Sequence, residues 1–182
     1  MAMVHFSKRL YECVFVHYFS KPSKSLNKLI WEMAYYWLFF GLVVPFYLFH
    51  PQFQEGLWRS LLSDQYIASI YFILFGFFVF CQTMNFFCHV HLKMFRSRDL
   101  DPSRGIPRLH GFNYVSCANY FWEFLAWCCF ALVTQTLASF AFTTMSFFRM
   151  NSKAQKKHLR YIAEFKNHYP AEERRAFIPY LF

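Results

Sequence analysis

The chain has 182 residues, enough for one compact domain, and its 19 Lys and Arg residues outnumber 10 Asp and Glu residues to give a net charge of +9. Hydrophobic residues make up 57% of it and aromatic residues 24%, including 27 Phe and 12 Tyr. Soluble domains rarely carry so many large apolar side chains, so this composition favours a membrane protein. The basic residues lie between apolar runs, which disfavours nucleic acid as a partner and favours positions beside a membrane.

The first half of the chain contains two candidate membrane spans. A helix that crosses a bilayer needs about 20 apolar residues. Residues 29–49 fit this length, and Pro45 is expected to kink the helix near its far end. Residues 66–88 form the clearest span. Residues 1–28 precede both spans and lack the apolar core and cleavage site of a signal peptide.

A third apolar block covers residues 112–148, which is too long for one crossing and sufficient for two short ones. Polar residues at 134–136 indicate a midpoint turn. The Lys and Arg residues test this arrangement. Five of them lie in 1–28, one in 50–65, five in 93–111 and eight in 149–182. The positive-inside rule places the three strongly basic regions in the cytosol, which requires an even number of crossings within the block.

These observations predict an all-α fold, a polytopic membrane helix bundle of about four transmembrane helices followed by a cytosolic C-terminal helix. The chain is expected to form a single membrane domain over residues 1–182. Within it we expect a cytosolic N-terminal segment, residues 1–28, and a cytosolic tail, residues 149–182. Both termini would then lie on the cytosolic side of the membrane.

Polar residues at helical spacing interrupt the end of the second span. Asn85, His89, Lys93 and Arg96 fall within about 80° of one another on a helical wheel, so they share one face. An amide, an imidazole and two cations on one face favour an anionic or polyhydroxylated ligand at the cytosolic membrane surface. The alternative is a helix end whose cations reach lipid headgroups while Asn85 and His89 bond to neighbouring helices.

The segment SCANYFWE, residues 116–123, places a second polar group at the start of the third apolar block. Asn119 and Glu123 are four residues apart and share a helical face, and Tyr120 adjoins that face. Ionisable groups are costly inside a bilayer, and a buried Glu needs a partner or must stay protonated. The basic loop before this segment would place it at the cytosolic entrance of the span.

The C-terminal region carries a third polar pattern. A basic stripe at helical spacing is formed by Arg149, Lys153, Lys156 and Arg160. On another side of the same predicted helix, His158 and Tyr161 lie about one turn apart. The stripe indicates either a ligand-binding surface or attraction to anionic lipid, and for an isolated His or Tyr a structural role is the ordinary alternative.

Several common sites find no support in the sequence. The five glycines form neither a GxGxxG motif nor a P-loop, so a nucleotide would not be held in the Rossmann manner. No GxSxG motif occurs either. Cys88, His89 and His91 fit no common spacing of metal ligands, so no metal site is predicted.

Two long motifs resemble the C-terminal domain of the steroid 5α-reductase family. They are RGIPRLHGFNYVSCANYFWEFLAW and KKHLRYIAEFKNHYPAEERRAFIPYLF, the second of which ends in a distinctive IPYLF. Within the family, KRLYECVFVHYFS and NFFCHVHLKMFR are most similar to the very-long-chain trans-2-enoyl-CoA reductases of the endoplasmic reticulum. The resemblance covers nearly the whole chain. That branch carries a ubiquitin-like domain and further membrane helices before the KRL motif, which here begins at residue 8.

The resemblance implies NADPH as the cofactor and assigns roles to particular residues. The positions that match cofactor contacts are Asn85, His89, Lys93, Arg96, Arg104, Asn119, Glu123, His158 and Tyr161. Asn119 and Glu123 are expected at the nicotinamide end, and His89 departs from the steroid branch, which has an acid there. Tyr120 and Lys8 match the suspected catalytic pair of the enoyl-CoA branch.

The activity that the resemblance implies is NADPH-dependent reduction of the trans-2 double bond of very-long-chain enoyl-CoA, the last step of the fatty acid elongation cycle. Hydride would reach Cβ, the resulting enolate would be stabilised at the thioester oxygen, and a proton would reach Cα. The expected location is the endoplasmic reticulum membrane, with enoyl-CoA and membrane lipid as partners. Other elongation enzymes stay open as further partners.

Two alternatives to this function follow from the same sequence. One is a reductase of the same family that acts on a steroid or polyprenol enone. The other is a truncated, non-catalytic membrane scaffold of the elongation complex. The joint presence of Lys8, Tyr120 and Glu123 favours an enzyme over the scaffold.

Overall fold

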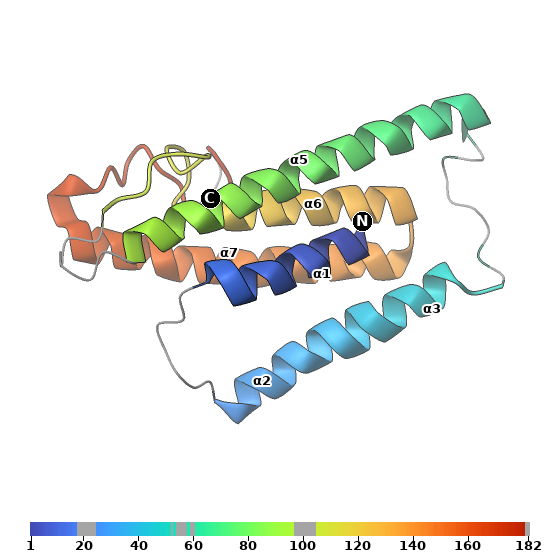
Figure 1. Ribbon diagram of the computed structural model, residues 1–182, viewed down its shortest axis with the longest axis horizontal. Helices are drawn as coiled ribbons and strands as arrows, with labels where there is room; N and C mark the ends of the chain where they lie inside the picture. The colour runs from blue at the N-terminus through green and yellow to red at the C-terminus, as the bar shows by residue number, and fades with distance from the viewer. Residues whose placement is uncertain (18–24, 52, 54–57, 59–60, 97–104, 181–182) are drawn as a thin grey trace.

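The computed structural model describes residues 1–17, 25–51, 53, 58, 61–96 and 105–180, without the side chains of residues 95, 96 and 167. Most of the described structure is helical (Figure 1). Its elements are α1 (Ala2–Tyr11), η1 (Glu12–Val16), α2 (Leu26–Met33), η2 (Ala34–Val43), α3 (Val44–Leu48), α5 (Asp64–Arg96), α6 (Ala118–Thr134), α7 (Leu137–Phe165) and η3 (Lys166–His168). The described residues contain no strand, and one isolated bridge joins Val115 to Arg175. The all-α prediction is therefore confirmed.

Two described helices are long and apolar enough to cross a membrane, Leu26–Leu48 and Asp64–Met94. The first covers the predicted span 29–49 except for its last residue, and the second contains the whole of the predicted span 66–88. Their large apolar side chains point mostly outward, and Trp31 and Phe72 are 76% and 80% exposed. A core helix of a soluble protein would bury such residues, so this exposure indicates a lipid-facing surface.

The first of these helices is not α-helical throughout. Residues Ala34–Val43 form a π-helical run, η2, and the α-helical turn that follows it begins at Val44, with Pro45 as its second residue. Because proline has no backbone N–H, the continuous helix lacks one backbone hydrogen bond at this position. The helix continues past Pro45 to Leu48, so the change in helix type precedes the proline.

The third apolar block folds as the predicted hairpin. Helix α6 ends at Thr134 and α7 begins at Leu137, which confirms the turn expected at 134–136. Gln135 takes a left-handed conformation with φ 50°, and the Thr136 hydroxyl caps α7 by accepting a hydrogen bond from the Ser139 amide at 3.1 Å. The two helices run side by side in Figure 1.

Helix α7 continues without a break through the boundary predicted for the tail. It passes residue 149 and ends at Phe165, so the C-terminal helix is an extension of the fourth apolar helix and not a separate element. A helix satisfies its own backbone hydrogen bonds in both lipid and water, so it need not end at the membrane surface. The cytosolic placement of residues 149–182 stays a prediction.

Three aromatic side chains tie η2 to the hairpin. Phe40, Trp127 and Phe142 lie in mutual contact, with ring centroids 4.8–5.1 Å apart. All three are buried. Aromatic pairs of this kind contribute roughly 0.5–1.5 kcal/mol each beyond the area that they bury. This cluster fixes the position of η2 against α6 and α7.

The N-terminal helix α1 packs against the bundle with one face, and His5 is its one buried residue. Its His5 side chain is buried, shares a hydrogen bond with Gln82 of α5 at 3.0–3.3 Å, and places its ring 4.6 Å from that of Trp127 in α6. The predicted cytosolic N-terminal segment, residues 1–28, therefore contributes a helix that packs against α5 and α6. Its side of the membrane stays a prediction.

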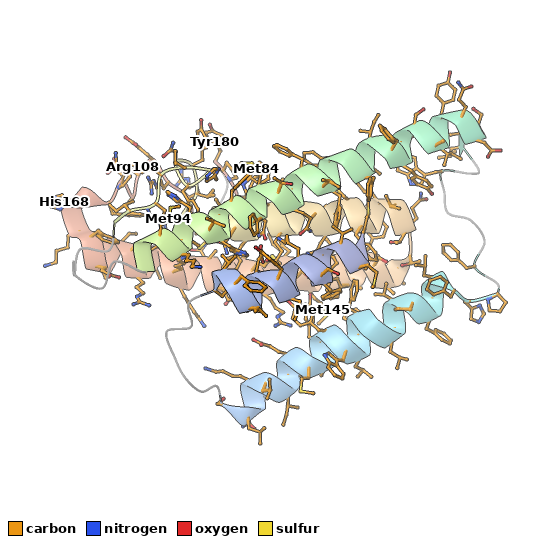
Figure 2. The ribbon with its side chains drawn as sticks, viewed as in Figure 1. Met84, Met94, Arg108, Met145, His168 and Tyr180 are labelled. Carbon is orange, nitrogen blue, oxygen red and sulfur yellow. The ribbon has the colours of Figure 1, made fainter. Side chains whose placement is uncertain are left out.

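The C-terminal residues fold back onto the segment before α6. The amide of Ser116 donates to the Arg175 carbonyl at 2.8 Å, and the Arg175 amide donates to the Tyr114 carbonyl at 3.0 Å. The buried Arg174 side chain donates to the Pro107 carbonyl at 3.0 Å. Figure 2 shows Arg108 and His168 at the end of the bundle where α7 finishes.

Candidate active site

Two cavities meet between the helices. The first cavity has a volume of about 190 Å³ and is lined by Arg9, Val16, His17, His89, Leu92, Lys93, Asn119, Tyr120, Glu123 and Lys157. The second cavity has a volume of about 140 Å³ and is lined by Arg9, Tyr35, Tyr36, Tyr120, Glu123, Ser146, Arg149, Met150 and Lys153. Arg9, Tyr120 and Glu123 line both cavities, and we call these three residues the shared wall.

The first cavity gathers five residues that the sequence assigned to the site. His89 and Lys93 reach it from α5, and Asn119, Tyr120 and Glu123 reach it from the first turns of α6. The helices bring these two groups together because α5 and α6 pack along their length. The SCANYFWE segment therefore lies at the junction of the two cavities.

Asn85 lies behind this surface and connects it to α1. Its Nδ2 atom donates to the Asn119 carbonyl at 2.7 Å, and its Oδ1 atom accepts a hydrogen bond from the Lys8 ammonium. Asn85 is buried and is not among the lining residues of either cavity. It fixes the start of α6 against α5.

Lys8, expected as a catalytic partner of Tyr120, lines neither cavity. Its ammonium is held by Asn85 and by the Glu12 carboxylate, whose Oε1 atom lies 3.3 Å away. The structure therefore places Lys8 outside both cavities, in contact with Asn85 and Glu12. Its catalytic role stays a prediction.

His158 and Tyr161 lie in a separate cluster with the C-terminal segment. His158 Nδ1 and the Tyr169 hydroxyl both bond to the Ser116 hydroxyl, and the rings of Tyr161 and Tyr169 are 5.7 Å apart. Burial lowers the pKa of His158, and the nearby Arg175 lowers it further. Neither His158 nor Tyr161 lines a cavity. Their assignment to the cofactor stays a prediction.

Two further predicted residues cannot be placed in the site. Arg104 lies outside the described residues, and Arg96 ends α5 without a described side chain. Their expected role with the cofactor stays a prediction. The rest of the predicted basic face, Asn85, His89 and Lys93, lies on α5 as helical periodicity requires.

Sequence reasoning missed several lining residues. In the first cavity these are Arg9, His17 and Lys157, and in the second they are Tyr35, Tyr36, Ser146, Arg149 and Lys153. Arg149 and Lys153 belong to the basic stripe noted above, so a partial signal existed. For Arg9 the available signal was Glu12, three residues later, which is the spacing of an ion pair on one helix face.

In the second cavity, contacts with neighbouring side chains fix the position of the Arg149 guanidinium. The Arg149 guanidinium stacks on the Tyr35 ring with its carbon 3.9 Å from the ring centroid. The Tyr35 hydroxyl bonds to the Ser146 hydroxyl and donates to the Phe142 carbonyl at 3.3 Å. These contacts join η2 to α7 and hold Arg149 in a defined position.

Comparison with known proteins decides the family. A sequence profile of the 3-oxo-5-alpha-steroid 4-dehydrogenase family matches residues 23–182. The chain belongs to this family. A Schizosaccharomyces pombe protein named as an enoyl reductase is 37% identical over 99% of the chain and 57% of its own length. The very-long-chain enoyl-CoA reductase of Dictyostelium discoideum is 35% identical over 98% of the chain and 55% of its own length.

One relative named for a steroid reaction is less similar than these two proteins. The 3-oxo-5-alpha-steroid 4-dehydrogenase 1 of Macaca fascicularis is 28% identical over 100% of the chain and 65% of its own length. The chain thus spans little more than half the length of the enoyl reductases that it matches. Membership of the family, together with the two apolar helices, supports a membrane protein.

The family's reductases imply a nicotinamide cofactor, and the first cavity fits such a group. The buried Oδ1 atom of Asn119 has no hydrogen-bond partner among the described residues, so it is available to accept from a carboxamide. Lys93, Lys157 and Arg9 bring three cations to the same cavity. A neutral acceptor beside several cations matches the amide and the phosphates of a dinucleotide.

Proposed function

We propose that this chain carries the catalytic site of an NADPH-dependent trans-2-enoyl-CoA reductase that acts on very long acyl chains in the endoplasmic reticulum membrane, with both termini cytosolic. The observation that carries the proposal is the shared wall, where Arg9, Tyr120 and Glu123 face both cavities. A reaction between two bound molecules requires a place where their reacting ends meet. The name of the Dictyostelium discoideum relative, a very-long-chain enoyl-CoA reductase at 35% identity, supports the substrate class.

In this proposal the first cavity binds the cofactor and the second cavity binds the thioester. Bound NADPH supplies hydride for Cβ of the enoyl group. The Tyr120 hydroxyl donates a hydrogen bond to the thioester oxygen, where negative charge develops as Cβ is reduced. The Arg9 guanidinium adds positive charge at the same wall, and Asn119 and Glu123 orient the nicotinamide carboxamide.

The direct test is a reduction assay with the 182-residue chain in nanodiscs. We expect oxidation of NADPH that depends on a long-chain trans-2-enoyl-CoA, with much weaker oxidation of NADH because the basic residues bind the extra phosphate. Loss of NADPH absorbance and mass detection of the saturated acyl-CoA measure this reaction. Binding of NADPH without turnover of any enoyl-CoA would contradict the proposal, and absence of NADPH binding would favour the scaffold alternative.

Arg149 and Lys153 favour an acyl-CoA over a neutral enone as the substrate. Both cations line the second cavity, although a steroid or polyprenol carries no phosphate for them to bind. We therefore expect Arg149→Gln to raise the KM for enoyl-CoA about tenfold, since a hydrogen bond to a charged group contributes about 1.5–3 kcal/mol. The KM for the corresponding enoyl-pantetheine thioester, which lacks the nucleotide phosphates, should stay within about twofold.

Arg160→Gln is the matched control for this substitution. Arg160 lies on the same helix, pairs with Glu164 at 3.6 Å on an exposed face, and lines neither cavity. It should leave both KM values unchanged. An equal rise for both thioesters in Arg149→Gln would mean that the guanidinium does not bind the nucleotide part of CoA.

A further inference from the structure

The side chain of Glu12 is fully buried and surrounded by positive or protonatable groups. Its Oε2 atom lies 2.9 Å from Arg9 Nη1 and 3.0 Å from His89 Nδ1, and its Oε1 atom lies 3.3 Å from the Lys8 ammonium. These neighbours lower the pKa of Glu12 to about 2, although burial alone would raise it. A single carboxylate therefore holds residues of α1 and α5 together.

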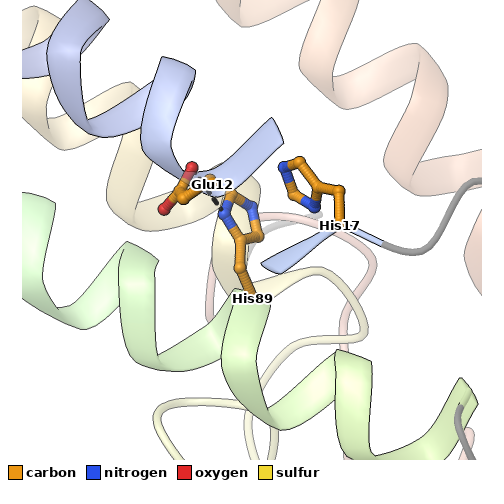
Figure 3. A group of neighbouring side chains, drawn as sticks. All are labelled: Glu12, His17 and His89. Carbon is orange, nitrogen blue, oxygen red and sulfur yellow. Dashed lines mark ion pairs between the residues drawn. The ribbon is translucent and has the colours of Figure 1, made fainter. Parts of the chain in front are cut away.

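The residues around Glu12 include a set that could be taken for the ligands of a metal ion. Glu12, His17 and His89 bring their ligand atoms within 4.8 Å of one another (Figure 3). However, Arg9 Nη1 lies 2.9 Å from Glu12 Oε2 and 3.4 Å from both His17 Nε2 and His89 Nδ1. The guanidinium already occupies the space among the three ligands, and a metal cation there would be repelled by it. The cluster is therefore suited to hold Arg9.

The geometry also fixes the hydrogen on His89. A carboxylate can only accept hydrogen bonds, so the 3.0 Å contact requires a hydrogen on His89 Nδ1. Arg9 Nη1 cannot donate to that same nitrogen, and its 3.4 Å approach is a contact and not a hydrogen bond. Glu12 is consequently the acceptor for both His89 and Arg9, which makes it the anchor of the cluster.

A local change of helix type places Glu12 where it can do this. The α-helical turns of α1 end at Tyr11, and Glu12 begins the π-helical turn η1. Lys8 and Arg9 lie four and three residues before Glu12, on the same side of the helix, so both side chains contact its carboxylate. Lys93 of α5 secures the far end of the turn by donating to the Phe15 carbonyl at 2.7 Å. Single π-turns of this kind occur frequently at functional sites.

We propose that Glu12 is a positioning residue that holds the Arg9 guanidinium on the shared wall, with its remaining N–H groups directed to an anionic oxygen of the bound cofactor. This inference rests on the proposed function. The described contacts of Arg9 all run through Nη1, so Nη2 and Nε are available to an occupant. An arginine fixed in this way loses less conformational freedom when a ligand binds.

A double-mutant cycle on NADPH affinity tests this role in the 182-residue chain in nanodiscs. Glu12→Gln and Arg9→Gln are each expected to raise the Kd for NADPH about tenfold, which is about 1.4 kcal/mol. The double variant should bind no more weakly than Arg9→Gln alone, because Glu12 acts through Arg9. A purely structural role would not produce this coupling.

Glu164→Gln is the matched control, because it releases Arg160 from an ion pair that lies away from both cavities and should leave the Kd unchanged. Unchanged affinity in Glu12→Gln, or additive losses in the double variant, would overturn the inference and leave the proposed function standing. A wild-type chain that binds no NADPH would instead overturn the proposed function and this inference with it.

A second variant keeps the test decisive if Glu12→Gln does not fold. Arg9→Lys retains the charge but loses the planar fork that can bond Glu12 and an occupant at once. It should therefore bind NADPH about as weakly as Arg9→Gln. Wild-type affinity in Arg9→Lys would show that charge alone is sufficient and that no fork needs to be positioned, which contradicts the role of Glu12.

Discussion

Replacing Tyr120 by Phe should lower kcat for enoyl-CoA reduction by about 10²–10³-fold, the range typical of a lost hydrogen-bond donor to a developing oxyanion. The substitution removes only the hydroxyl, from a side chain that lines both cavities at the start of α6. Because Phe keeps the ring, the Kd for NADPH should change less than about threefold. Single-turnover reduction of enoyl-CoA at saturating NADPH separates the two quantities.

Tyr114→Phe provides the control for this experiment, since Tyr114 is exposed and lines neither cavity. It should retain wild-type kcat. NADPH oxidation that survives at the wild-type rate in Tyr120→Phe would remove the role assigned to Tyr120. The proton or hydrogen bond at the thioester oxygen would then have to come from another group of the shared wall, and Arg9 is the remaining donor there.

The parts of the site that lie on one helix could be predicted from the sequence. Helical periodicity put His89 and Lys93 on one side of α5, and it put Asn119 and Glu123 on one side of α6. Both pairs line the first cavity. The polar residues at 134–136 likewise indicated the turn of the hairpin, because Gln135 and Thr136 supply the left-handed residue and the helix cap that it needs.

The parts that depend on contacts between distant segments could not be predicted in this way. Lys8 meets Asn85 across 77 positions of the chain, and Tyr35 meets Phe142 across 107. No periodicity within α1 or η2 indicates which helix face they will pack against. The sequence predicts that residues 1–28 are a cytosolic segment, which stays a prediction, but it does not indicate that α1 supplies Arg9 and η1 supplies Glu12 beside the first cavity.

For the same reason, most residues of the second cavity could not be recognised from the sequence. Tyr35 and Tyr36 appeared as ordinary aromatic residues of a membrane span, and Arg149 appeared as one cation of a stripe that could bind lipid. Only the packing of η2 on α7, fixed by the Phe40, Trp127 and Phe142 cluster, turns them toward a common space. The second cavity therefore depends on tertiary packing, whereas many residues of the first cavity could be recognised within single helices.

The second large effect is expected at Glu123, which is 7% exposed and belongs to the shared wall. Glu123→Ala should raise the Kd for NADPH by about 10–100-fold, because a hydrogen bond between the carboxamide and a carboxylate contributes about 1.5–3 kcal/mol. Glu123→Gln keeps an acceptor oxygen and should fall between Ala and the wild type. The carboxylate also interacts with the charges of Arg9 and Lys8, so its removal makes the cavity more positive.

This increase in positive charge makes it possible to test which part of the cofactor Glu123 contacts. A more positive cavity should bind phosphates at least as well, so 2′-phospho-ADP-ribose, which lacks the nicotinamide, should bind Glu123→Ala as tightly as the wild type. Calorimetric titration of both ligands makes the comparison. Equal weakening of the two ligands would place the effect of Glu123 on the phosphate half, and unchanged NADPH affinity would remove Glu123 from the cofactor site. Selective loss of NADPH affinity would assign the Asn119 and Glu123 face to the nicotinamide.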